Sequence, residues 1–379
     1  MTLISAGITI LLMMHSASQT PTSATPCSQS ITGQAFGFGG SPEGQLSGSS
    51  THIAVDTTGN LFVADSFNAR IVRVAPGGAL SSIAGLGGQR MLGDGGPVRY
   101  VEPSPDGVAV DRGGNLYIAD SLARVRKVTP SAVITNVAGG ATLYGPLGQP
   151  VAGFSGDGGP AISGRVLAKE IAVDEAGNLY IAASGGCIRK VTADGTIRTL
   201  VGNNSFTSLG ALSGIAVDKG GNLYTTDSTG NRIFRVTPGG VVSVFAGTGV
   251  RGFAGDGSSA ASAEFNQPSS IAIDSAGNLY IADSGNFRIR KITPAAVIST
   301  VAGTGVGVIA GDTGPATDTP LSNPRGIAVD GAGNFYIADV RTVPGAGGGG
   351  QVRIFKVTPE GLLSTIVPAM GNINPRGQR

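Results

Sequence analysis

Tryptophan is absent from this chain of 379 residues, and histidine and cysteine occur only twice each. The two histidines, His15 and His52, are too few for a zinc site that takes several imidazole ligands, and no GxSxG motif is present. Charged residues make up only 13% of the chain, with 26 basic against 24 acidic side chains. No basic patch stands out, so the electrostatic signature of a nucleic-acid-binding protein is missing.

The two cysteines, Cys27 and Cys187, cannot form a disulfide framework. A single Cys27–Cys187 bridge is possible in an oxidising compartment. The alternative, which we expect, is that Cys187 is a small, half-buried strand residue.

The first residues predict export. Residues 2–14 form an apolar run that is followed by small residues at 16–18, as in a signal peptide, although no Lys or Arg precedes the run. The run is too short to span a membrane comfortably. We expect a signal peptide over 1–18, a polar linker over 19–51 and a secreted or periplasmic protein. A second long apolar run is missing, so no membrane span is expected in the mature chain.

A phrase of the form GIAVD-x-x-GN-LYIAD recurs six times at intervals of 44 to 63 residues. Removing the segments between copies leaves a constant unit of 33 or 34 residues, so the length variation lies in the linkers. A fixed unit of this size indicates a solenoid, propeller or array. The Gly-Asn pairs begin at Gly59, Gly114, Gly177, Gly221, Gly277 and Gly333.

Each copy reads as four β-strands. In the fifth copy, 271–273 and 279–282 are apolar on both faces, which is typical of strands covered on both sides. Residues 289–292 and 297–301 alternate, which predicts half-exposed strands. Four strands graded from buried to exposed describe a propeller blade with its innermost strand first. The sequence therefore predicts an all-β fold, a six-bladed β-propeller over 52–367 with four-stranded antiparallel blades and a tail over 368–379.

The turns fit this fold. The glycine of each Asp-x-x-Gly-Asn turn sits where a positive φ is needed between strands one and two. Thr-Pro turns join strands three and four. Blade 6 carries its own fourth strand at 362–367, so closing the ring does not require an N-terminal strand; residues 31–38 are the only upstream candidate for one.

These residues resemble the NHL-repeat family, whose repeats build propellers that are commonly six-bladed. The resemblance covers 52–367, and the linker phrase GFAGDG is similar to that of bacterial secreted NHL-repeat proteins and of the teneurin NHL domain. WD40 and kelch repeats rely on tryptophan, so they do not fit.

Two sets of charged residues recur. Asp and Arg flank the turn between strands two and three, and we expect them to form ion pairs that brace it: Asp65 with Arg70, Asp227 with Arg232, Asp283 with Arg288, and Asp120 with Arg124 in a shorter turn. Blade 3 has Ala183 and Cys187 there, and blade 6 has an insertion between Asp339 and Arg353. The linkers carry an aspartate in Gly-Asp-Gly-like turns, and we expect a turn rather than a calcium site at Asp94, Asp157, Asp256 and Asp312.

Loops on a rigid scaffold carry function, which directs attention to the linker side of the ring. The two positions before each strand one should surround the mouth of the central channel. We expect the candidate ligand-binding residues there, with mutual charge neutralisation as the alternative: His52, Asp106, Lys169, Glu170 and Arg325.

Two functions remain open. The first is an exported binding or scaffold propeller, monomeric and without cofactor, metal site or catalytic residues, that recognises a protein or peptide on its linker side. The second is a metal-dependent enzyme with carboxylate ligands in the channel, since related propellers include lactonases and a peptide-amidating lyase.

Overall fold

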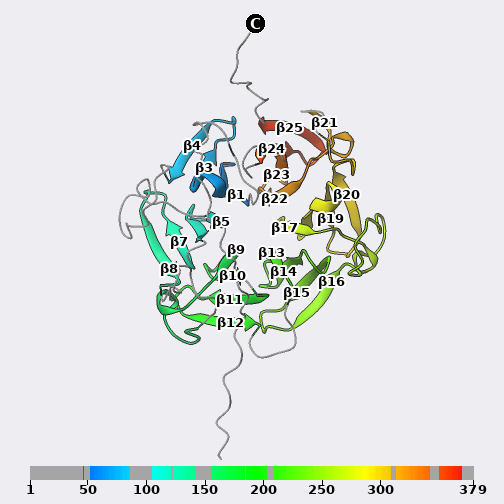
Figure 1. The fold of residues 1–379 in the computed structure, drawn as a ribbon. Coiled ribbons are helices and arrows are strands. Elements are labelled where there is room, and N and C mark those ends of the chain that lie inside the picture. The colour runs from blue at the N-terminus through cyan, green and yellow to red at the C-terminus, as the bar shows by residue number, and fades with distance from the viewer. Residues whose placement is uncertain are drawn as a thin grey trace, which may run out of the picture.

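The computed structural model describes Leu46 and residues 52–85, 105–120, 123–140, 155–183, 185–202, 209–308, 313–341 and 350–368. Six antiparallel sheets stand in a ring around a central channel, which confirms the six-bladed propeller (Figure 1). The described strands run from Ile53 to Val367.

Blades 1 to 3 each consist of four consecutive strands. Blade 1 contains β1 (Ile53–Val55), β2 (Leu61–Asp65), β3 (Arg70–Val74) and β4 (Leu80–Ala84). Blade 2 contains β5 (Pro105–Val110), β6 (Leu116–Asp120), β7 (Arg124–Val128) and β8 (Ile134–Ala138). Blade 3 contains β9 (Ala168–Val173), β10 (Leu179–Ala183), β11 (Cys187–Val191) and β12 (Ile197–Val201).

Blades 4 to 6 repeat the order. Blade 4 contains β13 (Leu212–Val217), β14 (Leu223–Asp227), β15 (Arg232–Val236) and β16 (Val242–Ala246). Blade 5 contains β17 (Pro268–Ile273), β18 (Leu279–Asp283), β19 (Arg288–Ile292) and β20 (Ile298–Ala302). Blade 6 contains β22 (Pro324–Val329), β23 (Phe335–Arg341), β24 (Gln351–Val357) and β25 (Leu362–Val367), and β21 (Thr313–Pro315) pairs with β25.

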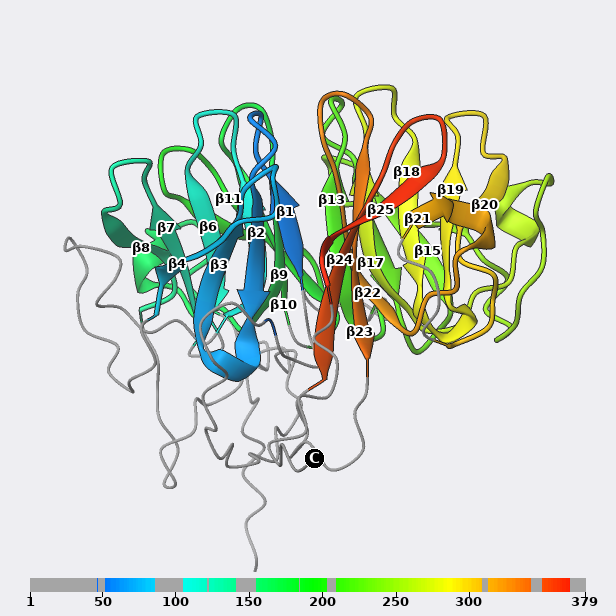
Figure 2. The ribbon, with the colours of Figure 1, turned by 90° about the horizontal axis from the view of Figure 1, so that it is seen from above.

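The first strand of each blade lines the channel, and the fourth lies at the rim (Figure 1). The turns between strands one and two and between strands three and four lie on one side of the ring, here called the turn face. The linkers between blades and the turns between strands two and three lie on the other side, the linker face (Figure 2).

The Asp-x-x-Gly-Asn turn explains why the repeat phrase is so constant. In blade 5, Gly277 has a φ of +84°, which suits glycine. The Asp274 carboxylate accepts hydrogen bonds from the backbone N–H groups of Ala276 and Asn278, the Asn278 amide and the Tyr280 hydroxyl. One aspartate thus saturates the turn and ties it to strand two. Equivalent aspartates bond to the following asparagine in the other blades, at Asp56, Asp111, Asp174, Asp218 and Asp330.

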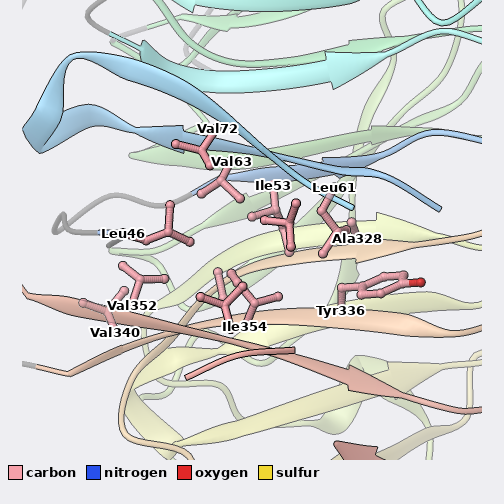
Figure 3. Close-up of a cluster of buried hydrophobic side chains, with 13 residues drawn as sticks. Leu46, Ile53, Leu61, Val63, Val72, Ala328, Tyr336, Val340, Val352 and Ile354 are labelled. Carbon is pink, nitrogen blue, oxygen red and sulfur yellow. The ribbon is translucent and has the colours of Figure 1, made fainter. Parts of the chain in front are cut away.

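The core lies between the blades, where side chains of one sheet pack against the next. Each of the clusters of buried apolar residues takes members from two neighbouring blades. At the seam between blades 6 and 1, Val63 and Val72 face Val352 and Ile354, with Leu46 at the edge of the cluster (Figure 3). Burial of this apolar surface is the dominant force holding the ring together.

The ring closes without a shared sheet among the described residues. β25 pairs with β24 inside blade 6, and β1 to β4 form blade 1 alone, as the sequence predicts. The backbone N–H of Val352 donates to the carbonyl of Leu46 at 3.3 Å. The upstream candidate strand 31–38 lies outside the described residues, as do residues 1–45 and 369–379 as a whole.

The linkers before blades 3, 5 and 6 cover the outer edge of the blade that follows them. Before blade 3, Pro160 bridges to Thr196 at the start of β12, and the short 3-10 helix η3 (Ala161–Ser163) then leads towards β9. Before blade 5, Ser259 bridges to Val297, and η4 (Ala260–Ser262) follows. An uncovered edge strand is a template for aggregation, so this cover protects the rim.

The ion pair at the strand two–three turn forms in only some of the blades where it was expected. Asp65 accepts from Arg70 at 2.7 Å, and Asp120 lies 3.4 Å from Arg124. Blade 6 also has it despite its insertion: Asp339 accepts from Arg353 at 2.6 Å.

In blades 4 and 5 the prediction of these pairs is wrong. Arg232 donates to the carbonyl of Thr248 at 3.2 Å, while the Asp227 carboxylate accepts backbone N–H groups of its own turn. Arg288 donates to the carbonyl of Thr304 at 2.8 Å, and the arginine that pairs with Asp283 is Arg290. Backbone carbonyls of the linker compete with the carboxylate for these guanidinium groups.

Cys187 is fully buried at the start of β11 and is disulfide-bonded. The expectation of a half-buried free thiol is therefore wrong. Cys27, the only other cysteine in the sequence, lies outside the described residues.

Candidate functional site

A β-bulge at the start of the first strand brings the predicted residues to the channel. In blade 2, Pro105 pairs with Asp120 and Gly107 with Ala119, so Asp106 is the extra residue. The same bulge isolates Lys169 in blade 3 and Arg325 in blade 6. A bulge re-aims side chains, and here it does so at the linker-face end of the inner strands of blades 2 to 6. The other bulge residues are Ser213 and Ser269.

The residue after the bulge lies closest to the neighbouring blade. A Cβ on Gly107 would lie 2.8 Å from the Glu170 carboxylate, and one on Gly214 would lie 2.9 Å from the Cα of Ser270. This confirms that close approach around the axis demands glycine at these positions. His52 and Glu170 occupy the equivalent position in blades 1 and 3, and their side chains meet across the channel.

His52 reaches from blade 1 to three other blades. Its Nδ1 lies 2.7 Å from the carbonyl oxygen of Asp106 in blade 2. Its Nε2 lies 3.0 Å from the carbonyl oxygen of Ser213 in blade 4 and 2.9 Å from Oε2 of Glu170 in blade 3. Both ring nitrogens face oxygen acceptors, so both carry a proton and the imidazole is charged.

The electrostatics agree with this geometry. Burial disfavours a charged imidazole, but the Glu170 carboxylate and the two carbonyl oxygens outweigh it and raise the pKa of His52 to about 9. Burial also raises the pKa of Glu170, against the attraction of His52. The His52 and Glu170 side chains narrow the linker-face end of the channel, and this pair is called the plug below.

A cavity of about 270 Å³ lies along the channel beside the plug, lined by the inner strands. The repeated Ile-Ala-Val phrase supplies its walls, with alanine such as Ala109 and Ala216 at the centre. A second cavity of about 400 Å³ opens on the turn face and shares Val173, Val217 and Ile273 with the first. The channel is thus accessible from the turn face and narrowed by His52 and Glu170 at the linker face.

Lys169 and Asp106 form an ion pair at 3.0 Å on the linker face outside the plug. Their side chains are 47% and 22% exposed, so a ligand can compete for both. Exposed pairs of this kind contribute little to stability.

Arg325 completes the ring at the linker-face mouth, but its side chain contacts none of the other four predicted residues among those that the structure describes. It forms no ion pair within the described ranges, and its Nε is buried without a hydrogen-bond partner. Burial alone lowers the pKa of Arg325. The structure therefore brings His52, Asp106, Lys169 and Glu170 together in blades 1 to 3 and leaves Arg325 as a separate cation.

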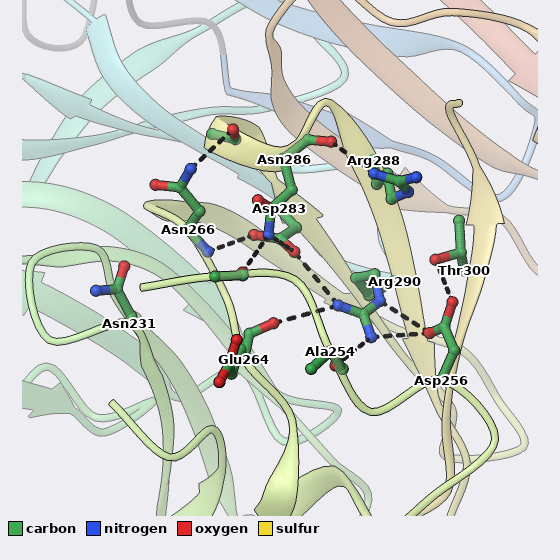
Figure 4. Close-up of polar contacts among 12 residues, drawn as sticks. Asn231, Ala254, Asp256, Glu264, Asn266, Asp283, Asn286, Arg288, Arg290 and Thr300 are labelled. Carbon is green, nitrogen blue, oxygen red and sulfur yellow. Dashed lines mark hydrogen bonds and ion pairs between the residues drawn. The ribbon is translucent and has the colours of Figure 1, made fainter. Parts of the chain in front are cut away.

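The linker aspartates bind arginines rather than only shaping turns. Arg290 in β19 is fully buried, and its Nη2 donates to Asp256 at 2.8 Å and to the carbonyl of Ala254 at 3.1 Å (Figure 4). Asp256 also accepts from Thr300. In blade 3, Arg189 donates to Asp157 at 2.6 Å in the same way. Strand three of blade 5 is partly exposed at Lys291, but the alternation of its residues did not predict that Arg290 would be fully buried.

The sequence contains a signal for this network that strand periodicity alone does not reveal. An arginine occupies the same strand-three position in three blades, Arg126, Arg189 and Arg290, and each of those blades is preceded by a Gly-Asp-Gly linker. Asp94 and Asp312, the other two linker aspartates, lie outside the described residues.

No group of three or more histidine, cysteine, aspartate or glutamate side chains is placed to hold a metal ion in the part of the chain that the structure describes. Over the same residues, no helix is long and apolar enough to cross a membrane.

Known proteins share this repeat and its blades. The family model of the teneurin NHL domain matches residues 207–293 and 251–310, which contain blades 4 and 5. The chain is an NHL-repeat propeller. Human Teneurin-4 is 26% identical over 333 residues, an alignment that covers 77% of this NHL-repeat propeller and 12% of Teneurin-4. The chain thus spans only a small part of the length of that relative.

Solved structures share the fold. A Bacteroides thetaiotaomicron protein of unknown function has a TM-score of 0.58 at 19% identity, covering 87% of this NHL-repeat propeller and 74% of that chain. An auxiliary nutrient binding protein from the same species has a TM-score of 0.55 at 14% identity, covering 82% and 70%. A gluconolactonase from Xanthomonas campestris has a TM-score of 0.51 at 12% identity, covering 85% and 86%. At these identities the likeness concerns the fold alone, and the fold carries both binding proteins and enzymes.

Proposed function

We propose that this NHL-repeat propeller is an exported, non-catalytic recognition module that binds a protein or peptide on its linker face. The observation that carries the proposal is that both ring nitrogens of His52 are protonated and hydrogen-bonded. His52 is the only histidine outside the expected signal peptide. Both of its nitrogens are engaged by acceptors. It has no free lone pair for a metal ion or for taking a proton from a substrate.

The residues around the plug favour binding. Lys169 and Asp106 are exposed enough to exchange their ion pair for contacts with a ligand. Arg325 offers a cation without a partner among the described residues. These side chains stand on strand ends of a rigid ring, which is where a preorganised site is best supported.

A pull-down from culture supernatant tests the proposal. The tagged wild-type protein should retain a partner. The double variant Lys169→Glu, Arg325→Glu should weaken that retention about tenfold or more, because carboxylates would then face the groups of the partner that pair with these two cations. Lys219→Glu, on an exposed turn-face lysine, is the matched control and should retain the partner. Equal retention by the double variant and wild type would reject the linker-face mouth as the contact site.

Two further measurements address the other parts of the proposal. Mass spectrometry of the exported protein should find a mature N-terminus near residue 19, because small residues precede it. Hydrolysis of a panel of lactones, abolished by EDTA, would overturn the non-catalytic assignment and favour the metal-dependent enzyme.

A further inference from the structure

Four of the exposed large apolar side chains of the described structure lie in the two linkers that flank blade 5, on its linker face. They are Val250 at 57%, Phe253 at 41%, Val306 at 55% and Val308 at 48% exposure. The first two lie in the linker before blade 5, and the other two lie in the linker after it. With Arg251 and Arg288 they make up the surface that we call the blade 5 patch.

Arg288 at the start of β19 holds the two linkers in place. Its guanidinium carbon lies 3.9 Å from the centre of the Phe253 ring, and its Nη2 donates to the carbonyl of Thr304 at 2.8 Å. The Asn286 amide donates to the carbonyl of Gly252 at 2.7 Å. The patch is therefore fixed before any partner arrives, which reduces the entropy lost on binding.

Two arginines of the blade 5 patch lack a direct ion-pair partner among the described residues, although Asp256 and Asp283 attract Arg288 and the Glu264 carboxylate lies beside Gly252. Within the described ranges, neither Arg251 nor Arg288 forms an ion pair, whereas the nearby Asp256 and Asp283 are engaged by Arg290. Burial and the charge of Arg290 lower the pKa of Arg288, as expected for a cation beside another cation.

Three of the remaining exposed apolar side chains are spread over the turn face. Val241, Val297 and Leu362 each follow a Thr-Pro turn, in three different blades. Single exposed apolar residues are ordinary, whereas a cluster with an aromatic ring and arginine has the composition of a protein interface.

We propose that the blade 5 patch docks an acidic segment of a partner protein, whose carboxylates meet Arg251 and Arg288 and whose apolar side chain packs beside Phe253 and Val306. This inference rests on the proposed function and gives the partner its chemistry. Arginine and an aromatic ring in one fixed surface are the residues in which binding energy concentrates.

The test uses the full propeller and two short capped peptides. One peptide alternates glutamate with leucine and phenylalanine, and the other has lysine in place of each glutamate. Fluorescence anisotropy at low salt should show binding of the glutamate peptide only, with an affinity that falls as salt rises. Binding of both peptides alike, or of neither, would overturn the proposal.

Variants then locate the contact. Phe253→Ser with Val306→Ser should weaken binding of the glutamate peptide about tenfold or more, and Arg251→Glu should weaken it further at low salt. Val241→Ser with Leu362→Ser removes equally exposed apolar side chains from the turn face and should leave binding unchanged. Thermal melting of each variant shows that the fold is kept; a double variant that melts like wild type and binds like wild type rejects the patch.

The outcome separates this inference from the proposed function. A supernatant partner whose retention depends on Lys169 and Arg325 but not on Phe253 and Val306 would reject the blade 5 patch and leave the recognition module standing.

Discussion

His52 places a positive charge inside the ring, where it joins blade 1 to blades 2, 3 and 4. An ion pair removed from water is costly unless every partner is in place. Here the two carbonyl oxygens and Glu170 supply those partners. The sequence alone indicated that the five mouth residues lie around one opening, but it could not indicate which of them would cross the channel.

The contribution of His52 to stability depends on pH in a defined direction. Its pKa rises from 6.5 to about 9 on folding, so the folded protein holds the proton more tightly than the unfolded chain. The contribution is complete below pH 6.5 and is lost as pH rises towards about 9. The contribution of His52 to the free energy of unfolding is at most about 3 kcal/mol, since each tenfold gain in proton affinity corresponds to about 1.4 kcal/mol.

We therefore expect His52→Gln to lower the free energy of unfolding most at pH below 6.5. The difference from wild type in urea unfolding should shrink as pH rises through 9, because wild type then loses the same charge. Groups that do not interact with His52 cancel in this difference, whereas Glu170 does not, because His52 lowers its pKa. A difference that stays constant over that range would show that His52 is neutral in the folded protein.

Two glycines in the Asp-x-x-Gly-Asn turn of blade 6 test whether a positive φ requires glycine there. Gly333 has a φ of +83°, whereas Gly331 has an ordinary φ and no atom near its missing Cβ. Gly333→Val should lower the free energy of unfolding by roughly 1 to 3 kcal/mol through strain. Gly331→Val, two residues away, should cost much less. Equal melting temperatures for the two variants would contradict the turn assignment.

At the scale of the element, the two Gly-Asp-Gly linkers that the structure describes are each fastened to the following blade through a buried arginine. Asp256 and Asp157 hold Arg290 and Arg189, whose side chains are fully buried. Periodicity predicted a half-exposed strand three in blade 5 and did not predict that Arg290 would be fully buried. The alternation of residues within a strand contains no information about the linker, which folds back over strand three and supplies carbonyl oxygens that accept hydrogen bonds from these arginines.

The substitution Asp256→Asn tests whether Asp256 only shapes a turn or also stabilises the protein through its ion pair with Arg290. Asparagine forms the same turn but has no charge. We expect it to lower the free energy of unfolding by about 1 to 3 kcal/mol, because Arg290 loses a charged hydrogen bond. The double variant Asp256→Asn, Arg290→Met should recover part of the loss. A fully stable Asp256→Asn protein would support the turn-only interpretation.

Blade 3 should be the least stable element of the ring. It has Ala183 where other blades have an aspartate that accepts hydrogen bonds in the strand two–three turn. Amide hydrogen exchange should be faster in residues 180–200 than in the matching residues 279–301 of blade 5. Oxidised and reduced protein are compared, because Cys187 is disulfide-bonded. Slower exchange in blade 3 in both states would contradict this ranking.

At the scale of the whole molecule, the repeat predicted the number of blades, the strand order and the two faces of the ring. These follow from local rules: apolar runs for inner strands, glycine at positive φ, and a constant unit length. The site depends instead on contacts between blades that are far apart in sequence, such as His52 with Ser213. No local pattern encodes such contacts, which is why the position of the candidate residues at the mouth could be predicted but their contacts with one another could not.

The self-contained blades also bear on how such a ring can be rearranged. Because each sheet is made of consecutive strands, no sheet is cut when the chain is opened at the start of a linker instead of at the seam between β25 and β1; opening the linker before blade 6 after β21 would separate β21 from β25. Circular permutants that begin at blade 2, 3, 4, 5 or 6 should therefore fold to the same ring. For the same reason, genetic duplication or deletion can act on one blade as a unit, and the contacts between blades, both side-chain packing at the seams and the bonds of His52 across the channel, restrict the number of blades that closes.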